Sequence, residues 1–207
     1  MHEKRETRNE KPSGVAAYIL AGGKSSRMGG KDKASLKLGD KTLLEIMRAK
    51  AKSFSDRVLI VGSKQKFGPA AIEDLFPNRG PLAGIHAALH SSPTELNLML
   101  AVDLPFVEPA FLPYLVLQAE SSQAVVTIPR TAARWQPLCA IYRRSFADSA
   151  EKALAAGRNK IDALFAGVSI RIIDEEELKQ AGFSAEIFAN LNTPEEFAAA
   201  ERFAKSE

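Results

Sequence analysis

Glycines, hydroxyl side chains and cations follow an apolar run near the start of the chain. The run over residues 15–20 is typical of a buried strand, and residues 22–31 then contain no apolar side chain except Met28. Two adjacent glycines, Gly22 and Gly23, let the main chain turn sharply and lie against a ligand. Backbone N–H groups in such a turn can converge on phosphate oxygens. The sequence therefore predicts a loop that binds a nucleoside triphosphate.

Cations and one carboxylate complete this expected site. Arg27 and Lys33 place positive charge at the loop, where they would face the triphosphate. Asp103 follows the apolar run of residues 96–102 and stands just before Leu104-Pro105. Mg²⁺ prefers oxygen ligands and bridges protein carboxylates to substrate phosphates. We expect Asp103 to hold Mg²⁺, with Mn²⁺ as an alternative; its other interpretation is a turn carboxylate.

Two common phosphate-binding motifs are absent from the sequence. Gly23-Lys24-Ser25 imitates the end of a Walker A motif, but Tyr18 stands where the first glycine of that motif belongs. A G-x-G-x-x-G fingerprint is also missing. The loop is therefore neither a P-loop nor a Rossmann dinucleotide site.

Other side chains could also carry chemistry. Asp74 ends a short strand-like segment and is interpreted either as a contact with the base or ribose or as an exposed turn carboxylate. His86 and His90 share one helical face, a spacing that can chelate a metal, but without an evident third ligand a packing or surface role is favoured. Cys139 lies in an apolar run and is expected in the core.

Length and composition set the remaining limits. The 207 residues, 45% of them hydrophobic, suit one domain over residues 15–207, preceded by a polar and flexible tail over residues 1–14. No apolar stretch approaches the ~20 residues of a membrane helix, and one cysteine excludes a disulfide framework. These features favour a cytoplasmic location without a membrane partner. A net charge of +3 does not call for a nucleic-acid partner.

Strands alternate with helices in the first half of the chain, which predicts βαβ units and a mainly parallel sheet with both faces covered. The expected buried parallel strands are residues 15–20, 57–61 and 96–102, and the near-continuous apolar run of residues 57–61 is typical of a central strand of the sheet. Gly22, Gly62 and Asp103 then stand at their carboxyl ends, where such sheets bind ligands. A short strand over residues 34–38 and a helix over residues 64–71 are also expected.

Thr42 with Glu45 three residues later indicates a capping box at the start of a helix. The second half of the chain is expected to mix strands and helices.

The motifs, taken in order, resemble those of the MobA-like nucleotidyltransferases. Leu20-Ala-Gly-Gly-Lys-Ser-Ser-Arg-Met-Gly, followed by Asp32-Lys33, is similar to their opening signature. Further matches are Ile72-Glu-Asp74, Gly80-Pro-Leu-Ala-Gly84, Asp103-Leu-Pro105 and Phe188-Ala-Asn-Leu-Asn-Thr-Pro-Glu-Glu196. Within this superfamily the ordered set is most similar to the guanylyltransferases that act on the molybdenum cofactor.

The resemblance implies a Rossmann-like three-layer α/β/α fold with a mostly parallel sheet and a partly antiparallel edge. It implies transfer of GMP from Mg·GTP to the terminal phosphate of molybdopterin, which releases pyrophosphate and gives the guanine dinucleotide form of the molybdenum cofactor. GTP and the molybdenum cofactor are thus the implied partners. Proteins that deliver the cofactor or mature molybdoenzymes are left open as further partners.

Matching positions assign roles to single residues. The implied nucleotide contacts are Leu20, Ala21, Gly22, Gly23, Lys33, Asp74 and Asp103. The implied catalytic residues are Arg27, Lys33 and Asp103, and those on the acceptor side are Gln136, Asn190 and Asn192. Two positions depart from the family: Gln136-Pro137 replaces a His-Pro pair, and an asparagine expected near residues 61–63 is absent.

Three alternatives remain beside this interpretation. Cytidylyltransferases, for the molybdenum cofactor or an isoprenoid alcohol phosphate, typically carry Leu-Ala-Ala-Gly, whereas Gly22 takes that third position here and favours guanine. Sugar-phosphate nucleotidyltransferases continue their signature with Gly-x-Arg-Leu, which Ser26-Arg27-Met28 does not fit. A nucleotide-binding sensor without catalysis is disfavoured because Arg27, Lys33 and Asp103 are all present.

Overall fold

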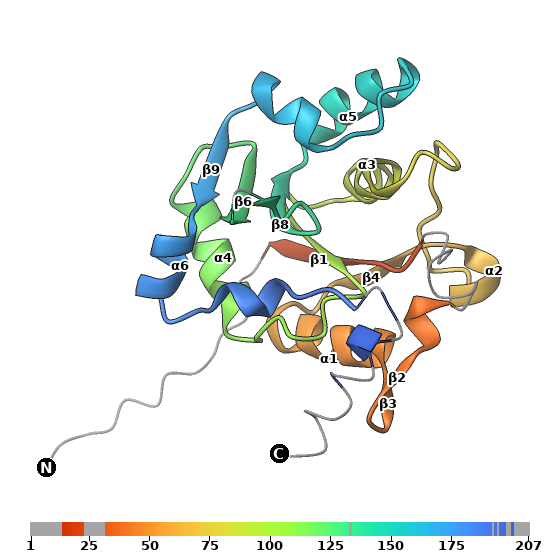
Figure 1. The fold of residues 1–207 in the computed structure, drawn as a ribbon. Helices are drawn as coiled ribbons and strands as arrows, with labels where there is room; N and C mark the ends of the chain where they lie inside the picture. Colours follow the sequence, from red (N-terminus) through yellow and green to blue (C-terminus); the bar gives the residue numbers. More distant parts are fainter. Residues whose placement is uncertain are drawn as a thin grey trace, which may run out of the picture.

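The computed structural model describes residues 14–22, 32–132, 134–191, 193, 195–197 and 200. A mixed sheet of seven strands forms its centre, in the order β4-β1-β5-β8-β6-β7, with β9 paired to β6 (Figure 1). The strands are β1 (Val15–Leu20), β4 (Val58–Val61), β5 (Leu96–Ala101), β6 (Val126–Thr131), β7 (Arg134–Trp135), β8 (Cys139–Arg143) and β9 (Ile170–Ile173).

The sheet divides into a parallel half and a mostly antiparallel half. In the parallel half β1 pairs with both β4 and β5 in the same direction, with Leu20 opposite Val61 on one side and Ala101 on the other. In the other half β8 runs antiparallel to β5 and β6, and β6 pairs antiparallel with β7 and parallel with β9. This is the expected mostly parallel core with an antiparallel edge.

Helices cover both faces of the sheet, which completes the expected three layers. In Figure 1, α3 and α5 lie above the sheet and α1 lies below it. The α-helices are α1 (Leu43–Phe54), α2 (Lys64–Phe67), α3 (Pro81–Ser91), α4 (Phe111–Glu120), α5 (Phe146–Ala155) and α6 (Glu175–Gln180). Shorter elements are the 3-10 helices η2 (Lys33–Ser35), η3 (Asp162–Gly167) and η4 (Ala185–Phe188), and the hairpin of β2 (Lys37–Leu38) and β3 (Lys41–Thr42).

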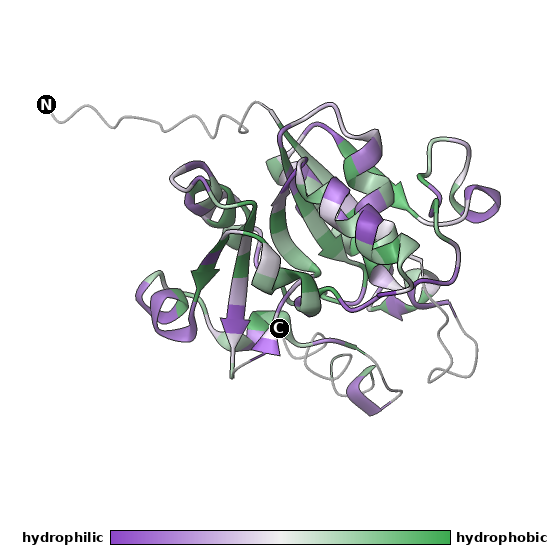
Figure 2. Cartoon of the chain, turned by 90° about the horizontal axis from the view of Figure 1, so that it is seen from above, coloured by the Kyte–Doolittle hydropathy of each residue, from purple (hydrophilic) through white to green (hydrophobic). Residues whose placement is uncertain are grey.

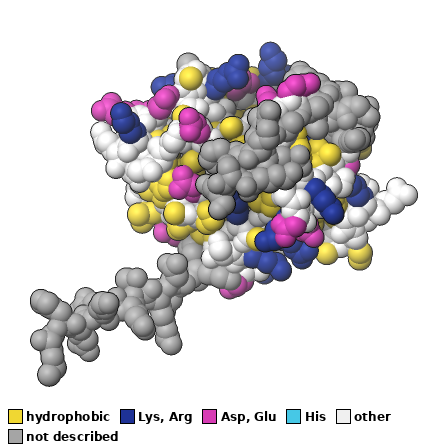
Figure 3. Space-filling model, turned by 60° about the horizontal axis from the view of Figure 1, so that its bottom comes forward, with side chains coloured by type: hydrophobic (Ala, Val, Ile, Leu, Met, Phe, Trp, Pro, Cys, Tyr) yellow, Lys and Arg dark blue, Asp and Glu magenta, His cyan; other side chains and the backbone are white. Residues whose placement is uncertain are grey.

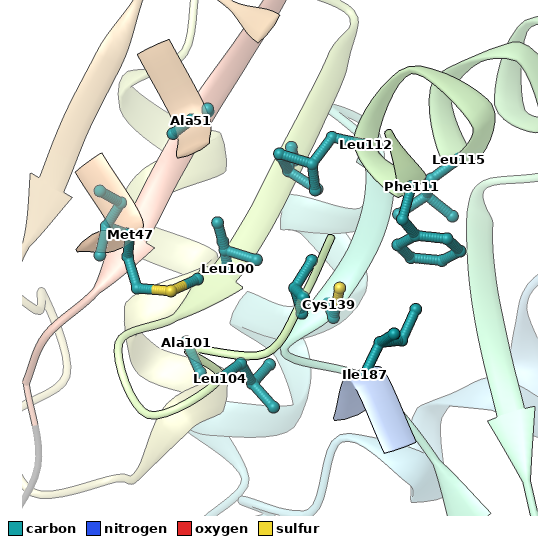
Figure 4. Packing of buried hydrophobic residues seen from close by; sticks show 14 of the residues in the cluster. Met47, Ala51, Leu100, Ala101, Leu104, Phe111, Leu112, Leu115, Cys139 and Ile187 are labelled. Carbon is teal, nitrogen blue, oxygen red and sulfur yellow. The ribbon is translucent and has the colours of Figure 1, made fainter. Parts of the chain in front are cut away.

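Strand β1 is buried on both faces because its side chains alternate between two cores. Ala17 and Ile19 join the cluster with α1 and α4, whereas Tyr18 and Leu20 join the cluster with α3 and α5. Figure 4 shows part of the first cluster, in which Met47 of α1 and Leu100 of β5 lie close together. The central strands are accordingly apolar, and hydrophilic colour is concentrated on the outer elements (Figure 2).

Local sequence signals explain where helix α1 begins and where helix α5 ends. Helix α1 starts with the expected capping box, because the Thr42 side chain accepts from the Glu45 N–H and the Glu45 carboxylate accepts from the Thr42 N–H at 2.7 Å. Gly157, with φ of 74°, follows α5 in the left-handed conformation that favours glycine.

Three expectations about single elements are wrong. Residues 34–38 form the end of η2 and the two-residue strand β2, because the Asp32 side chain accepts from the Ala34 N–H and caps a helical turn. Helix α2 ends at Phe67, just before Gly68 with φ of 89°. Strand β4, expected to be central, is the outermost strand of the parallel half, and among the described residues only an isolated bridge to Ile72 lies beyond it.

On the face drawn in Figure 3, basic and acidic side chains are interspersed, with apolar side chains between them. Among the described residues, no helix has the length and apolar character needed to cross a membrane.

Candidate nucleotide-binding site

A cavity of about 520 Å³ lies at the carboxyl ends of β1, β4 and β5. Its volume falls within the range of about 300–1,000 Å³ that is usual for small-molecule sites. Because the carboxyl ends of parallel strands meet at one edge of a sheet, ligands of such folds bind there. The cavity is lined by Leu20, Ala21, Gly22, Asp32, Lys33, Val61, Asp74, Asn78, Gly80, Pro81, Gly84, Ala101, Val102, Asp103 and Leu138.

The end of β1 supplies the floor of the cavity. Main-chain bonds extend past the strand on both sides: the Ala21 N–H donates to the Val61 carbonyl at 3.0 Å, and the Val102 N–H donates to the Leu20 carbonyl at 3.2 Å. Gly22 follows and is exposed to the cavity. A Cβ there would lie 3.7 Å from Gly62 Cα, an ordinary contact, so the protein itself has room for alanine at this position.

Lys33 and Asp103 bring opposite charges to one wall of the cavity. Lys33 Nζ donates to Asp103 Oδ2 at 2.7 Å across 70 residues of sequence, and the two side chains are 21% and 19% exposed. The position of Lys33 follows from Asp32, which caps η2 and also forms an ion pair with Lys66 of α2. One ammonium and one carboxylate therefore face the same part of the cavity.

The C-terminal segment contacts the main chain of Asp103. The Leu191 N–H donates to the Asp103 carbonyl at 3.1 Å, and Leu191 is buried. Asn190, the preceding residue, is exposed and does not line the cavity. The expected acceptor residue Asn190 thus directly precedes the residue that bonds to Asp103, but it is not part of the cavity lining.

Asp74 lines the cavity beside α3, where a Cβ on Gly84 would lie 3.6 Å from Asp74 Oδ1. Desolvation by the surrounding protein raises the pKa of its carboxyl, although solvent reaches the residue through the cavity. The start of α3 lies very close to β1, because a Cβ on Gly84 would come within 2.8 Å of Leu20 Cδ2. The absence of a side chain at Gly84 lets the helix pack directly on Leu20, and a Cβ there would require the Leu20 side chain to shift.

Asn78 and Leu138 line the cavity but were not expected there. Asn78 has φ of 62° and precedes Gly80 with φ of 71°, so the segment turns twice in the left-handed region before α3 begins. An asparagine two residues before a glycine is a turn signal that the sequence does carry. Leu138 carries no such signal, since its place depends on β8 packing beside β5.

The residues present fit a divalent cation bound together with a nucleotide. The described residues hold no cluster of three or more His, Cys, Asp or Glu side chains that could bind a metal by themselves. Mg²⁺ is usually bound by one or two carboxylates together with substrate phosphates. Asp103, a partly exposed carboxylate at the end of a rigid strand in a cavity of nucleotide size, is a donor of that kind.

Three of the expected site residues are not described, and a further one, like Asn190, does not line the cavity. Gly23, Arg27 and Asn192 fall outside the described residues. Gln136 is described, but its Nε2 donates to Thr131 Oγ1 at 3.0 Å within the β6–β7 region, and it does not line the cavity.

The histidines and the cysteine pack in the interior or beside it. His86 is 2% exposed, and neither of its ring nitrogens is hydrogen-bonded to any residue that the structure describes. Its ring meets Phe76 edge-on at 5.2 Å between centroids and stacks on His90 at 5.8 Å. Cys139 is buried in the core as expected, and its burial raises the pKa of the thiol.

Known proteins are similar to this chain in sequence and in fold. A molybdenum cofactor guanylyltransferase from Desulfosudis oleivorans is 34% identical over 93% of this chain and 96% of its own length. A probable molybdenum cofactor guanylyltransferase from Clostridium perfringens strain 13 is also 34% identical, over 88% of this chain and 93% of its own.

Solved structures agree with these relatives. The crystal structure of molybdopterin-guanine dinucleotide biosynthesis protein A from Archaeoglobus fulgidus is similar with a TM-score of 0.81 and 29% identity, over 93% of this chain and all of that one. The 2-C-methyl-D-erythritol 4-phosphate cytidylyltransferase of Thermus thermophilus, at 19% identity and a TM-score of 0.67, shares the fold over 93% of this chain and 99% of its own. Residues 17–169 match the MobA-like NTP transferase domain, and the chain belongs to that family.

Proposed function

We propose that this chain is a molybdenum cofactor guanylyltransferase, which transfers GMP from GTP to the terminal phosphate of molybdopterin and releases pyrophosphate. The observation that carries the proposal is the convergence of four separated segments on one cavity of about 520 Å³. These segments are the end of β1, η2, the loop before α3 and the end of β5, and each carries one of the motifs in which the sequence resembles the MobA-like nucleotidyltransferases.

Positioning is the main task of the protein in this reaction. Attack of a phosphate oxygen on the α-phosphorus of GTP needs alignment and charge neutralisation more than covalent help. The main chain of Leu20, Ala21 and Gly22 would lie along the nucleotide, and Asp74 would contact the guanine or the ribose. Desolvation around the Asp74 carboxyl would strengthen its hydrogen bonds to N–H or O–H donors.

Charge at the phosphates would be handled by Lys33 and Asp103. The family of nucleotidyltransferases works with a divalent metal, and we propose Mg²⁺ held by Asp103, with Mn²⁺ as a substitute. When bound, the metal neutralises charge that grows on the leaving pyrophosphate. Lys33, 2.7 Å from Asp103, would donate to a phosphate oxygen from the same wall of the cavity. Arg27, in the same motif, would add a second cation.

The acceptor needs no dedicated general base. A phosphate monoester is already largely ionised at neutral pH, because its second pKa is about 6. The expected acceptor residues would then only bind and orient. Gln136 and Asn190, with Asn192 next along the chain, would hold the pterin side, outside the nucleotide cavity.

A nucleotide-selectivity assay tests this function. The purified chain is incubated with molybdopterin-bound molybdenum and with GTP, CTP or ATP, with and without Mg²⁺, and pyrophosphate release and the dinucleotide product are measured. We expect release with GTP and Mg²⁺ only. Turnover with CTP alone would identify a cytidylyltransferase, and GTP binding without turnover would identify a sensor.

A further inference from the structure

The loop after Asp103 is attached to α1 by a lysine. Lys50 Nζ donates to the main-chain carbonyls of Pro105 at 2.5 Å and Val107 at 2.7 Å. Hydrogen bonds from a charged donor are stronger than those between neutral groups. Burial lowers the pKa of Lys50, and the nearby charge of Glu108 opposes that shift. The contacts connect an ammonium of α1 to a turn 55 residues away in the sequence.

The two carbonyls belong to a tight turn that starts one residue after Asp103. The Val107 N–H donates to the Leu104 carbonyl at 3.2 Å and closes the turn. Leu104 and Val107 are 3% and 0% exposed, so the turn is anchored in the core by its own side chains. Lys50 donates to two carbonyl groups that do not take part in the hydrogen bond that closes the turn.

The stem of Lys50 stands on the buried face of α1. Met47 and Ala51 belong to the same cluster as Leu104 (Figure 4). In the sequence of α1, Lys50 comes three residues after Met47 and directly before Ala51. Its partly buried position and two main-chain partners fix the ammonium at the turn. Lys52, two residues further along, is exposed and serves as a natural comparison.

We propose that Lys50 is a positioning residue for the Asp103 carboxylate, an inference that rests on the proposed metal–nucleotide site. The main chain around Asp103 is held before it by the bond from Val102 to Leu20 and at it by the bond from Leu191. Lys50 holds the main chain after Asp103 through its bonds to the Pro105 and Val107 carbonyls. Because Mg²⁺ demands near-ideal octahedral geometry, a small movement of its carboxylate ligand weakens binding.

Metal binding measured without turnover tests the proposal. Lys50→Met keeps most of the apolar stem and removes the charge and the donors, and Lys52→Met is the matched control on the same helix. Mn²⁺ binding is followed by electron paramagnetic resonance with GTP and no acceptor, GTP binding is measured without metal, and thermal unfolding is recorded. We expect Lys50→Met to weaken GTP-dependent Mn²⁺ binding about tenfold, equal to ~1.4 kcal/mol. Metal-free GTP binding should change less than twofold.

The outcomes separate positioning from simple stabilisation. A lowered unfolding temperature with unchanged Mn²⁺ affinity at 25 °C would overturn the inference, as would an equal loss in Lys52→Met. If Lys50→Met does not fold, Lys50→Gln, which keeps a shorter uncharged donor, is measured in the same way and must also weaken Mn²⁺ binding. A wild-type chain without GTP-dependent Mn²⁺ binding would instead contradict the proposed function itself.

Discussion

The two halves of the sheet contribute very unequally to the cavity. In the parallel half, β1, β4 and β5 each deliver residues to it at their carboxyl ends. In the antiparallel half, Leu138, just before β8, is the single lining residue among those described. Gln136, the residue that replaces the family's histidine, is hydrogen-bonded to Thr131 of its own half.

Strand direction explains this difference. Parallel neighbours all end at the same edge, so their following loops meet and can surround one ligand. Antiparallel neighbours end at opposite edges, so their loops are divided between two sides of the sheet. We infer that the parallel half binds the nucleotide and that the antiparallel half, with the C-terminal segment, binds the acceptor.

The largest expected effect comes from Asp103 in the parallel half, the carboxylate that we propose holds the metal. Asp103→Asn keeps the shape of the side chain and removes its charge, so kcat should fall about 100-fold, a loss of ~3 kcal/mol of transition-state stabilisation. The fall in kcat is measured from pyrophosphate release over a titration with Mg²⁺. Asp40→Asn, in the exposed β2–β3 turn, is the control and should be unchanged. Undiminished turnover in Asp103→Asn would contradict its metal role.

A smaller effect is expected at the nucleotide end of the cavity. Asp74→Asn should raise KM for GTP about tenfold (~1.4 kcal/mol) with kcat and acceptor KM little changed. Because the pKa of Asp74 is raised, the wild-type carboxylate protonates at a higher pH than an ordinary aspartate. GTP affinity should therefore weaken as pH falls, and less so in Asp74→Asn. Isothermal titration with GTP across pH decides this, and an identical pH profile in both proteins would refute the contact.

The antiparallel half is tested at Gln136. Gln136→Ala removes the bond to Thr131 and should raise KM for the molybdopterin acceptor about threefold, since one neutral hydrogen bond contributes ~1 kcal/mol or less. KM for GTP should stay the same. Gln136→His, which introduces the residue typical of the family, is the matched comparison. A rise in KM for GTP instead would contradict the inference that the antiparallel half binds the acceptor and the parallel half binds the nucleotide.

The smallest expected effect concerns the contact between the halves, where His86 of α3 lies near Glu151 of α5. Desolvation, with His90 assisting and Glu151 opposing, lowers the pKa of His86 below 6.5. As pH decreases through 6.5, His86 therefore binds a proton in the unfolded chain while it stays neutral in the folded chain, so the free energy of unfolding falls.

Urea unfolding at pH 7.5 and 5.5 measures this loss. His86→Leu should lose less stability between the two values than the wild type, and His90→Gln, on the exposed side of the pair, should still show most of the loss. Equal losses in His86→Leu and the wild type would exclude His86 as the cause.

Much of the candidate site could be predicted because its signals are local in sequence. Gly22 after β1 and Asp103 after β5 each follow a recognisable strand, and the parallel direction of these two strands brings both residues to the same edge of the sheet. Asn78 and Lys50 were missed for different reasons. Asn78 lies in an irregular turn without a periodic pattern, and Lys50 reads as an ordinary helix cation until its partners are known.

The sequence by itself determined the family and the alternation of strands and helices, and it predicted the residue types of the candidate site, because periodicity and motifs depend on neighbouring residues. Only the tertiary structure decided that β4 lies at the edge, that Lys33 meets Asp103 and that Lys50 holds the turn beyond it. The contacts of Lys50 and Lys33 join residues that are 55 to 70 positions apart in the sequence. Such contacts follow from how the packed faces of helices and strands fit together, and no local pattern specifies that fit.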